Sequence, residues 1–353
     1  MQLEHYERVT LTRIVRLRPG LNIRREQNVA TSFAFVPNDS FSSLDPQELF
    51  VGHYEAIRRS CQNYTRAGVL IFGMDQTAVP LGELWLDAED SGPRAGVIGR
   101  HSECDLVIPA SHISVSLRHI VVLVRRYSPG KVQIEVVDLA TGEGFADEQG
   151  QTRHSVTSEG PMFLRIGTVS LFFMTTPGLF SGKESAQAAY RKLPPRMFVD
   201  ETDFKERTQL RVIDSKEDSL PPSREQTRVR SKVGPVFGSL TLCERDETPV
   251  AAISYRVDRN RVVRSVGKTA LSRGVLIGRY SRCHLGPKVD SEDSRISRVH
   301  LLIMQHGDEV IAVDTASTNG TKINGDYCKF KILSEGDEID MGEGVKLLWN
   351  TAN

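Results

Sequence analysis

Three short polar segments near the C-terminal end of the chain carry the side chains best suited to binding an anion. Arg279 ends one apolar run, Ser297 comes shortly before another, and Thr318 and Asn319 follow a third. A guanidinium can hold two phosphate oxygens in a bidentate fork, and hydroxyl groups can donate to the third oxygen. If the apolar runs are neighbouring strands, these segments meet at one end of a sheet. The spacing therefore predicts a site for a phosphate dianion.

An internal repeat indicates which elements position these side chains. The segment "GVIGRHSECDL" (96–106) aligns with "GVLIGRYSRCHL" (274–285), and the apolar runs that follow each segment also match. Each copy consists of short runs rich in Val, Ile and Leu, separated by Gly, Asp, Asn and Ser, without a long helical period. We therefore predict an all-β chain that contains two copies of one β-sandwich.

The second copy resembles the forkhead-associated (FHA) domain family, whose pattern is Gly-Arg, then Ser-x-x-His, then Asn-Gly. The residues that match this pattern are Gly278, Arg279, Ser297, His300, Asn319 and Gly320. Each element is weak alone, because an Asn-Gly pair is also an ordinary tight turn. Together and in order they form a specific signal, which implies a sandwich that binds phosphothreonine peptides through the loops at one end.

The resemblance also assigns a role to each binding residue. It implies that Arg279 and Ser297 hold the phosphate, helped by Arg298 and Thr318. It further implies that Asn319 bonds the peptide backbone beside the phosphothreonine.

Other residues of the motif are expected to support the site or to tune it. Gly278, His300 and Gly320 are implied to be structural, with the histidine bracing the binding loop. Arg295 is implied to face the third residue after the phosphothreonine, where its charge would favour Asp or Glu. The alternative for Arg295 is a solvated arginine that the acidic residues of its own loop neutralise.

The first copy keeps only part of the motif. Arg100 and Ser116 stand at the positions of Arg279 and Ser297, but Glu143 replaces Asn319. A carboxylate near a bound phosphate opposes binding by on the order of 1 kcal/mol or more. We expect this copy to have lost ordinary phosphothreonine binding and to act as a scaffold or a protein-contact surface.

The domain boundaries follow from the repeat and from composition. We expect an N-terminal extension of unknown role over 1–77, with a helix near 46–62 that an Asp-Pro pair begins. The first FHA-like domain is expected over 78–175 and the second over 236–351. The highly charged residues between them, 176–235, bury too little apolar surface to fold alone and are predicted to be a flexible linker.

The predicted linker contains threonines that a kinase could modify. We hypothesise that phosphorylation of Thr202, Thr208 or Thr227 would supply an intramolecular ligand for the second domain. Each has Lys or Arg three residues further on. An acidic preference at that position would therefore point to a ligand on another protein.

Composition and motifs argue against several other classes of protein. The 45 basic and 45 acidic residues cancel, so no net charge attracts nucleic acid. The five cysteines have no metal-ligand spacing, and no apolar stretch is long enough to span a bilayer. The segment "VGKTA" (266–270) lacks the earlier glycine of a nucleotide-binding loop. We expect no catalytic residues, no metal, no cofactor, and a cytoplasmic protein with reduced thiols.

Two functions remain from the sequence. The first is an adaptor in Ser/Thr kinase signalling that binds a phosphothreonine-containing protein, such as a kinase or its substrate, through the second domain. The alternative is a phosphate-independent structural component of a protein assembly, for example a secretion apparatus.

Overall fold

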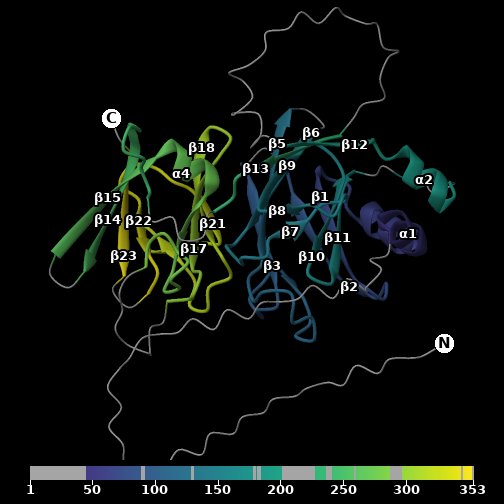
Figure 1. Cartoon of the computed structure of the whole chain (residues 1–353), viewed down its shortest axis with the longest axis horizontal. Helices are drawn as coiled ribbons and strands as arrows, with labels where there is room; N and C mark the ends of the chain where they lie inside the picture. The colour runs from purple at the N-terminus through teal and green to yellow at the C-terminus, as the bar shows by residue number, and fades with distance from the viewer. Residues whose placement is uncertain are drawn as a thin grey trace, which may run out of the picture. The chain divides into compact units, whose positions relative to one another are not determined.

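Strands dominate the computed structural model of the chain, and this confirms the predicted fold class (Figure 1). The structure describes residues 45–88, 92–128, 131–177, 180, 184–200, 227–235, 241–257, 260–286, 296–342 and 345–351. Within residues 43–353, which form one unit, the strands make two β-sandwiches.

The first sandwich, purple to teal in Figure 1, contains a sheet of six strands and a sheet of seven. The six-stranded sheet has the order β2-β1-β11-β10-β7-β8, with β1 (Gly68–Asp75), β2 (Pro80–Asp87), β7 (Phe145–Ala146), β8 (Thr152–Arg153), β10 (Met162–Ile166) and β11 (Val169–Thr176). The seven-stranded sheet has the order β12-β13-β9-β6-β5-β3-β4, with β3 (Arg94–Gly99), β4 (Leu106–Val107), β5 (Ile120–Ser128), β6 (Lys131–Asp138), β9 (Ser155–Ser158), β12 (Arg196–Asp200) and β13 (Thr227–Lys232).

The second sandwich, green to yellow in Figure 1, repeats this topology. One sheet has the order β15-β14-β23-β22-β19-β20, with β14 (Pro249–Val257), β15 (Asn260–Gly267), β19 (Lys322–Ile323), β20 (Asp326–Tyr327), β22 (Glu338–Asp340) and β23 (Lys346–Thr351). The other has the order β16-β17-β18-β21, with β16 (Val275–Ile277), β17 (Leu301–His306), β18 (Glu309–Asp314) and β21 (Phe330–Ile332). The matching strand orders support the tandem repeat that the sequence predicts.

Both faces of the central strands are buried, which explains their unbroken apolar runs. In β5, the side chains of Ile120 and Val122 face the core of the first sandwich, whereas Val121 and Leu123 face the opposite side. β17 has the same division between its two faces.

The outer faces of these strands pack on each other and join the two sandwiches. This interdomain cluster contains Val97, Cys104, Val121, Leu123, Val137, Leu139 and Ala140 from the first domain, and Leu276, Cys283, Leu302, Met304, Ile311, Val313 and Ala316 from the second. All of these side chains are buried. At about 25 cal/mol per Å² of apolar surface removed from water, such burial favours a fixed docking of the domains.

A buried polar cluster lies within the same interface. Nδ1 of His306 in the second domain is 2.6 Å from Oε2 of Glu135 in the first. Nζ of Lys232 lies 3.5 Å from the other carboxylate oxygen, Oε1. His306 is 1% exposed and Glu135 is 3% exposed, so water cannot screen this pair.

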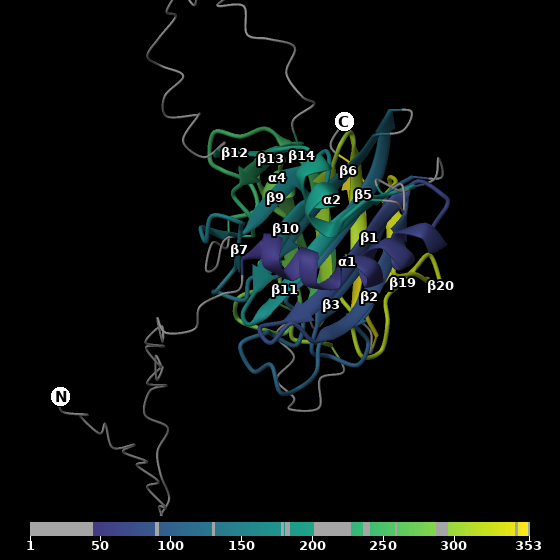
Figure 2. The same cartoon turned by 90° about the vertical axis from the view of Figure 1, so that its right-hand side faces the viewer.

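Two helices cover the outer face of the six-stranded sheet of the first sandwich (Figure 2). α1 (Pro46–Asn63) confirms the helix predicted at 46–62, and Asp45 caps it by accepting a hydrogen bond from the Gln47 main-chain N–H. α2 (Ala186–Lys192) packs beside it. No helix in the described ranges is long and apolar enough to cross a membrane.

The structure corrects two of the predicted domain boundaries. β1 belongs to the first sandwich, although the sequence assigned it to the N-terminal extension over 1–77. The predicted linker over 176–235 contains α2, β12 and β13, so its flexible character is wrong for those parts. β13 adds to the edge of β9, and β12 pairs with β13 in parallel. Edge pairing satisfies their main-chain groups, and Val229 of β13 and Phe198 of β12 pack on the core of the first sandwich.

Thr227 begins β13 and is 4% exposed, so the prediction of a kinase-accessible residue is wrong for this threonine. Thr202 and Thr208 lie outside the described residues.

Candidate anion-binding site

Strand direction brings the three polar segments of the second domain together. β16 and β17 are antiparallel, as are β17 and β18. The C-terminal end of β16, the N-terminal end of β17 and the C-terminal end of β18 therefore share one end of the sheet. Arg279, Ser297 and Thr318 lie at these three places, as the sequence predicts.

Hydrogen bonds connect the three loops around Ser297. The Arg279 main-chain N–H donates to the Ser297 carbonyl at 3.2 Å. The Thr318 N–H donates to the Ser297 hydroxyl at 3.0 Å, and the two hydroxyl oxygens lie 3.5 Å apart. Ser297 is 7% exposed, whereas Arg279, Arg298, Thr318 and Asn319 are exposed. The loops thus hold a fixed serine among exposed donors.

His300 braces the serine from below. The Ser297 N–H donates to Nδ1 of His300 at 3.2 Å, and the histidine is fully buried. Burial lowers the pKa of His300 despite the carboxylate of Asp314, whose Oδ2 lies 4.0 Å from Nε2. The imidazole is therefore neutral at pH 7, with its proton on Nε2.

Asp314 organises the third loop and was missed by the sequence reasoning. Its carboxylate accepts hydrogen bonds from the Ser317 N–H at 2.7 Å, from the Ser317 hydroxyl at 2.5 Å and from the Thr321 hydroxyl at 2.6 Å. These bonds hold Ala316 at a φ of 59° and Gly320 at a φ of 75°. The signal in the sequence is an Asp followed three residues later by Ser, a spacing typical of side chain-capped turns.

Arg295, which is predicted to face the third residue after the phosphothreonine, lies outside the described residues.

The first domain retains the frame of this site but uses its arginine differently. The Arg100 N–H donates to the Ser116 carbonyl at 3.1 Å, and the Ser116 N–H donates to Nδ1 of His119 at 3.0 Å. The Arg100 guanidinium, however, donates to the main-chain carbonyl of Val115 in its own loop. Glu143 is exposed in the loop that corresponds to Asn319. The first loop cluster therefore presents a carboxylate and an arginine already engaged by its own main chain.

Gly278 provides a test of how tightly these loops must pack. A Cβ at Gly278 would lie 2.4 Å from the Arg298 carbonyl oxygen, so Gly278→Ala must push the two loops apart. We expect it to lower the free energy of unfolding by about 1–3 kcal/mol and to abolish phosphopeptide binding. Gly68→Ala is the matched control, because its Cβ would lie 2.5 Å from the Leu86 carbonyl oxygen within the six-stranded sheet of the first domain. It should also destabilise the chain and leave binding intact, as urea unfolding and calorimetric titration would show.

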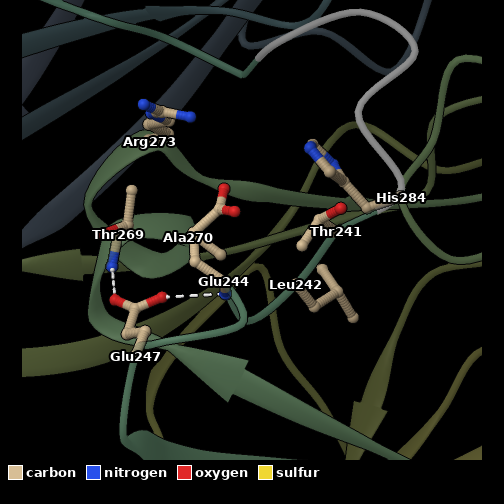
Figure 3. Close-up of a pocket in the computed structure, with 8 residues that line it drawn as sticks. All are labelled: Thr241, Leu242, Glu244, Glu247, Thr269, Ala270, Arg273 and His284. Atoms are coloured by element: carbon tan, nitrogen blue, oxygen red, sulfur yellow. Dashed lines mark hydrogen bonds between the residues drawn. The ribbon is translucent and has the colours of Figure 1, made fainter.

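The segment that resembles part of a nucleotide-binding loop lies elsewhere. Gly267 ends β15 and Thr269 belongs to α4 (Lys268–Arg273), beside a pocket that Leu242, Glu247 and Ala270 help to line (Figure 3). The Glu247 carboxylate accepts a hydrogen bond from the Thr269 N–H at 2.7 Å, and this bond lowers the pKa of Glu247. A carboxylate thus occupies the start of α4, where it repels a phosphate. The described residues contain no cluster of His, Cys, Asp or Glu able to hold a metal.

Comparisons with known proteins identify the second domain. The family model described as FHA domain matches residues 275–342, and this confirms the resemblance of the second copy. A comparison with curated proteins found no match.

Several solved structures are similar to parts of the chain. The FhaA FHA domain, in a complex with the intracellular domain of Rv3910, is 23% identical over 28% of this chain and 99% of its own, with a TM-score of 0.24. The FHA-1 domain of Rv1747 from Mycobacterium tuberculosis is 20% identical over 30% of this chain and 100% of its own, with a TM-score of 0.24. The FHA domain of CT664 from Chlamydia trachomatis is 17% identical over 31% of this chain and 99% of its own, with a TM-score of 0.26.

Proposed function

We propose that this chain, which carries an FHA domain at residues 275–342, is a non-enzymatic adaptor that binds phosphothreonine on a partner protein. The partner is a Ser/Thr kinase or a substrate of one, and the setting is cytoplasmic signalling. The observation that carries the proposal is the Ser297 hydroxyl, which accepts a hydrogen bond from the Thr318 N–H at 3.0 Å while the Ser297 carbonyl accepts one from the N–H of the exposed Arg279.

This arrangement suits a dianion bound on a peptide. The Thr318 N–H uses a lone pair of the Ser297 oxygen, so the serine proton is free to point toward a ligand. The exposed guanidinium of Arg279 can then supply a bidentate grip on two further oxygens. Asn319 lies next to this point and offers an amide for the peptide backbone.

Peptide arrays test the proposal on the intact chain. Matched peptides would carry phosphothreonine, phosphoserine or unmodified threonine at one fixed position between randomised flanks. We expect binding that requires phosphothreonine. Equal binding to the unmodified peptides would contradict the proposal and favour the phosphate-independent scaffold.

A further inference from the structure

The two domains exchange arginine contacts at the end of the interface that carries the binding loops. Arg118 of the first domain donates from Nε, at 2.9 Å, and from Nη2, at 2.6 Å, to the Ala316 carbonyl of the second. Arg282 of the second domain donates from Nη1 to the Thr141 carbonyl of the first, at 2.6 Å. Arg118 therefore binds the loop that follows β18 in the second domain, and Arg282 binds the loop that follows β6 in the first.

The two contacts differ, because Arg118 also reaches Ser297, one of the residues predicted to bind the phosphate. Nη2 of Arg118 lies 3.4 Å from the Ser297 hydroxyl oxygen. Val299 stands at the position of Arg118 in the second copy, and it has no donor to offer to the first domain. The contact therefore runs from the first domain into the site of the second.

A histidine of the first domain extends this row of donors. The Glu103 N–H donates to Nδ1 of His101 at 3.2 Å, so the neutral imidazole carries its proton on Nε2. That nitrogen lies 3.4 Å from Nη2 of Arg118, so two donors face each other. Burial, then the charge of Arg118, lowers the pKa of His101, and Arg298 adds to the effect. Two donors so placed can share one acceptor, such as a phosphate oxygen.

Arg118 is itself buried, at 8% exposed, without a carboxylate bonded to its guanidinium among the described residues. Burial lowers its pKa, although Asp314 opposes the effect. A buried cation of this kind is stabilised when an anion binds beside it, because the anion compensates the charge that water no longer solvates.

We propose that the first domain supplies Arg118 and His101 to the phosphate site of the second, so that one recognition site is shared between both domains. The inference rests on the proposed function and adds two residues of the first domain to its binding site. Arg118 fixes the Ser297 hydroxyl and the turn at Ala316, and the Nε2–H of His101 donates a hydrogen bond to the bound phosphate. The first domain thus acts in recognition although its own loop cluster carries Glu143.

The test uses the full chain and a phosphothreonine peptide that the wild type selects from the arrays. Arg118→Ala should weaken binding about 10-fold or more, because it removes charged hydrogen bonds. Arg118→Lys should recover part of the loss through its charge. Arg282→Ala is the matched control, since it removes an interdomain contact of the same kind whose acceptors, the Ala140 and Thr141 carbonyls, belong to the loop of the first domain. It should bind within about twofold of the wild type.

A second measurement distinguishes direct participation from domain docking. Nuclear magnetic resonance titration of His101 should show a higher imidazole pKa in the peptide complex than in the free chain, because a bound phosphate favours the charged form. Arg118→Gln should reduce the dependence of affinity on salt if the guanidinium acts on the phosphate.

Two results would overturn the inference. One is binding by Arg118→Ala and Arg118→Lys within about twofold of the wild type, and the other is an equal loss in Arg282→Ala. If Arg118→Ala has a lower melting temperature than the wild type, the affinity of Arg118→Lys and the His101 titration test the inference instead. Loss of binding in Arg279→Ala alone would refute the shared site and leave the proposed function standing. A wild type that selects no phosphothreonine peptide would refute the proposed function itself.

Discussion

Replacing Arg279 by alanine will weaken phosphothreonine binding by about 2 kcal/mol or more, roughly 30-fold, without unfolding the domain. Arg279 is exposed, so its side chain contributes little to stability. In the proposed complex its guanidinium holds two phosphate oxygens at once, a geometry that Lys cannot reproduce. Isothermal titration of the selected peptide into wild type and Arg279→Ala measures the change, and thermal melting checks the fold.

Arg100→Ala provides the matched control for this prediction. Arg100 occupies the same place in the first domain, but its guanidinium donates to the Val115 carbonyl of its own loop. The variant should lose some local stability and keep the affinity of the whole chain. An affinity of Arg279→Ala equal to that of the wild type would show that the phosphate binds elsewhere.

The sequence allowed the site loops to be predicted because strand alternation is a local property. Runs such as Leu301–His306 and Glu309–Asp314 are short, apolar and separated by a tight turn, so antiparallel pairing follows. That pairing alone places Arg279, Ser297 and Thr318 at one end of a sheet. The hydrogen bonds among them depend on loop backbone geometry, which residue types do not specify.

The docking of the two domains could not be predicted with the same argument. The run of Ile120–Val124 carries a signal, since a strand with one solvated face would alternate between apolar and polar residues. This run indicates that a second face is buried but not which surface covers it. Arg118 lies 179 residues from Ser297 in the chain, so no local pattern connects them.

The charged segment after the first domain was mispredicted for a related reason. Composition predicts that this highly charged segment cannot build a core alone, yet Val229 of β13 is fully buried and joins the core of the first sandwich. β13 is ordered by the existing edge of β9, whose main-chain groups pair with it from Lys232 to Val229. Edge addition needs hydrogen-bonding groups more than apolar side chains.

The buried contact between His306 and Glu135 leads to the second large effect. His306→Ala will lower the free energy of unfolding by about 3 kcal/mol, because it leaves the Glu135 carboxylate buried with Lys232 as its remaining charged partner. The double replacement Glu135→Leu with His306→Leu should restore most of this loss, since apolar side chains can fill the same interface. Urea unfolding of both variants measures the difference. Glu338→Gln, which breaks an exposed pair with Lys346, should leave the midpoint unchanged.

The same pair makes interdomain stability depend on pH, and the direction follows from Glu135. Burial alone would raise the pKa of this carboxyl, but the bond from His306 and the charge of Lys232 outweigh it and hold the pKa below its usual range. A carboxyl with a lowered pKa stabilises the folded state fully above its unfolded value, about 4.3, and loses that contribution as the pH falls through the folded value. The stability difference between wild type and the double Leu variant should therefore shift toward the Leu variant as the pH falls into the acid range. A difference that stays constant through the acid range would show that the Glu135 carboxylate does not stabilise the docked domains.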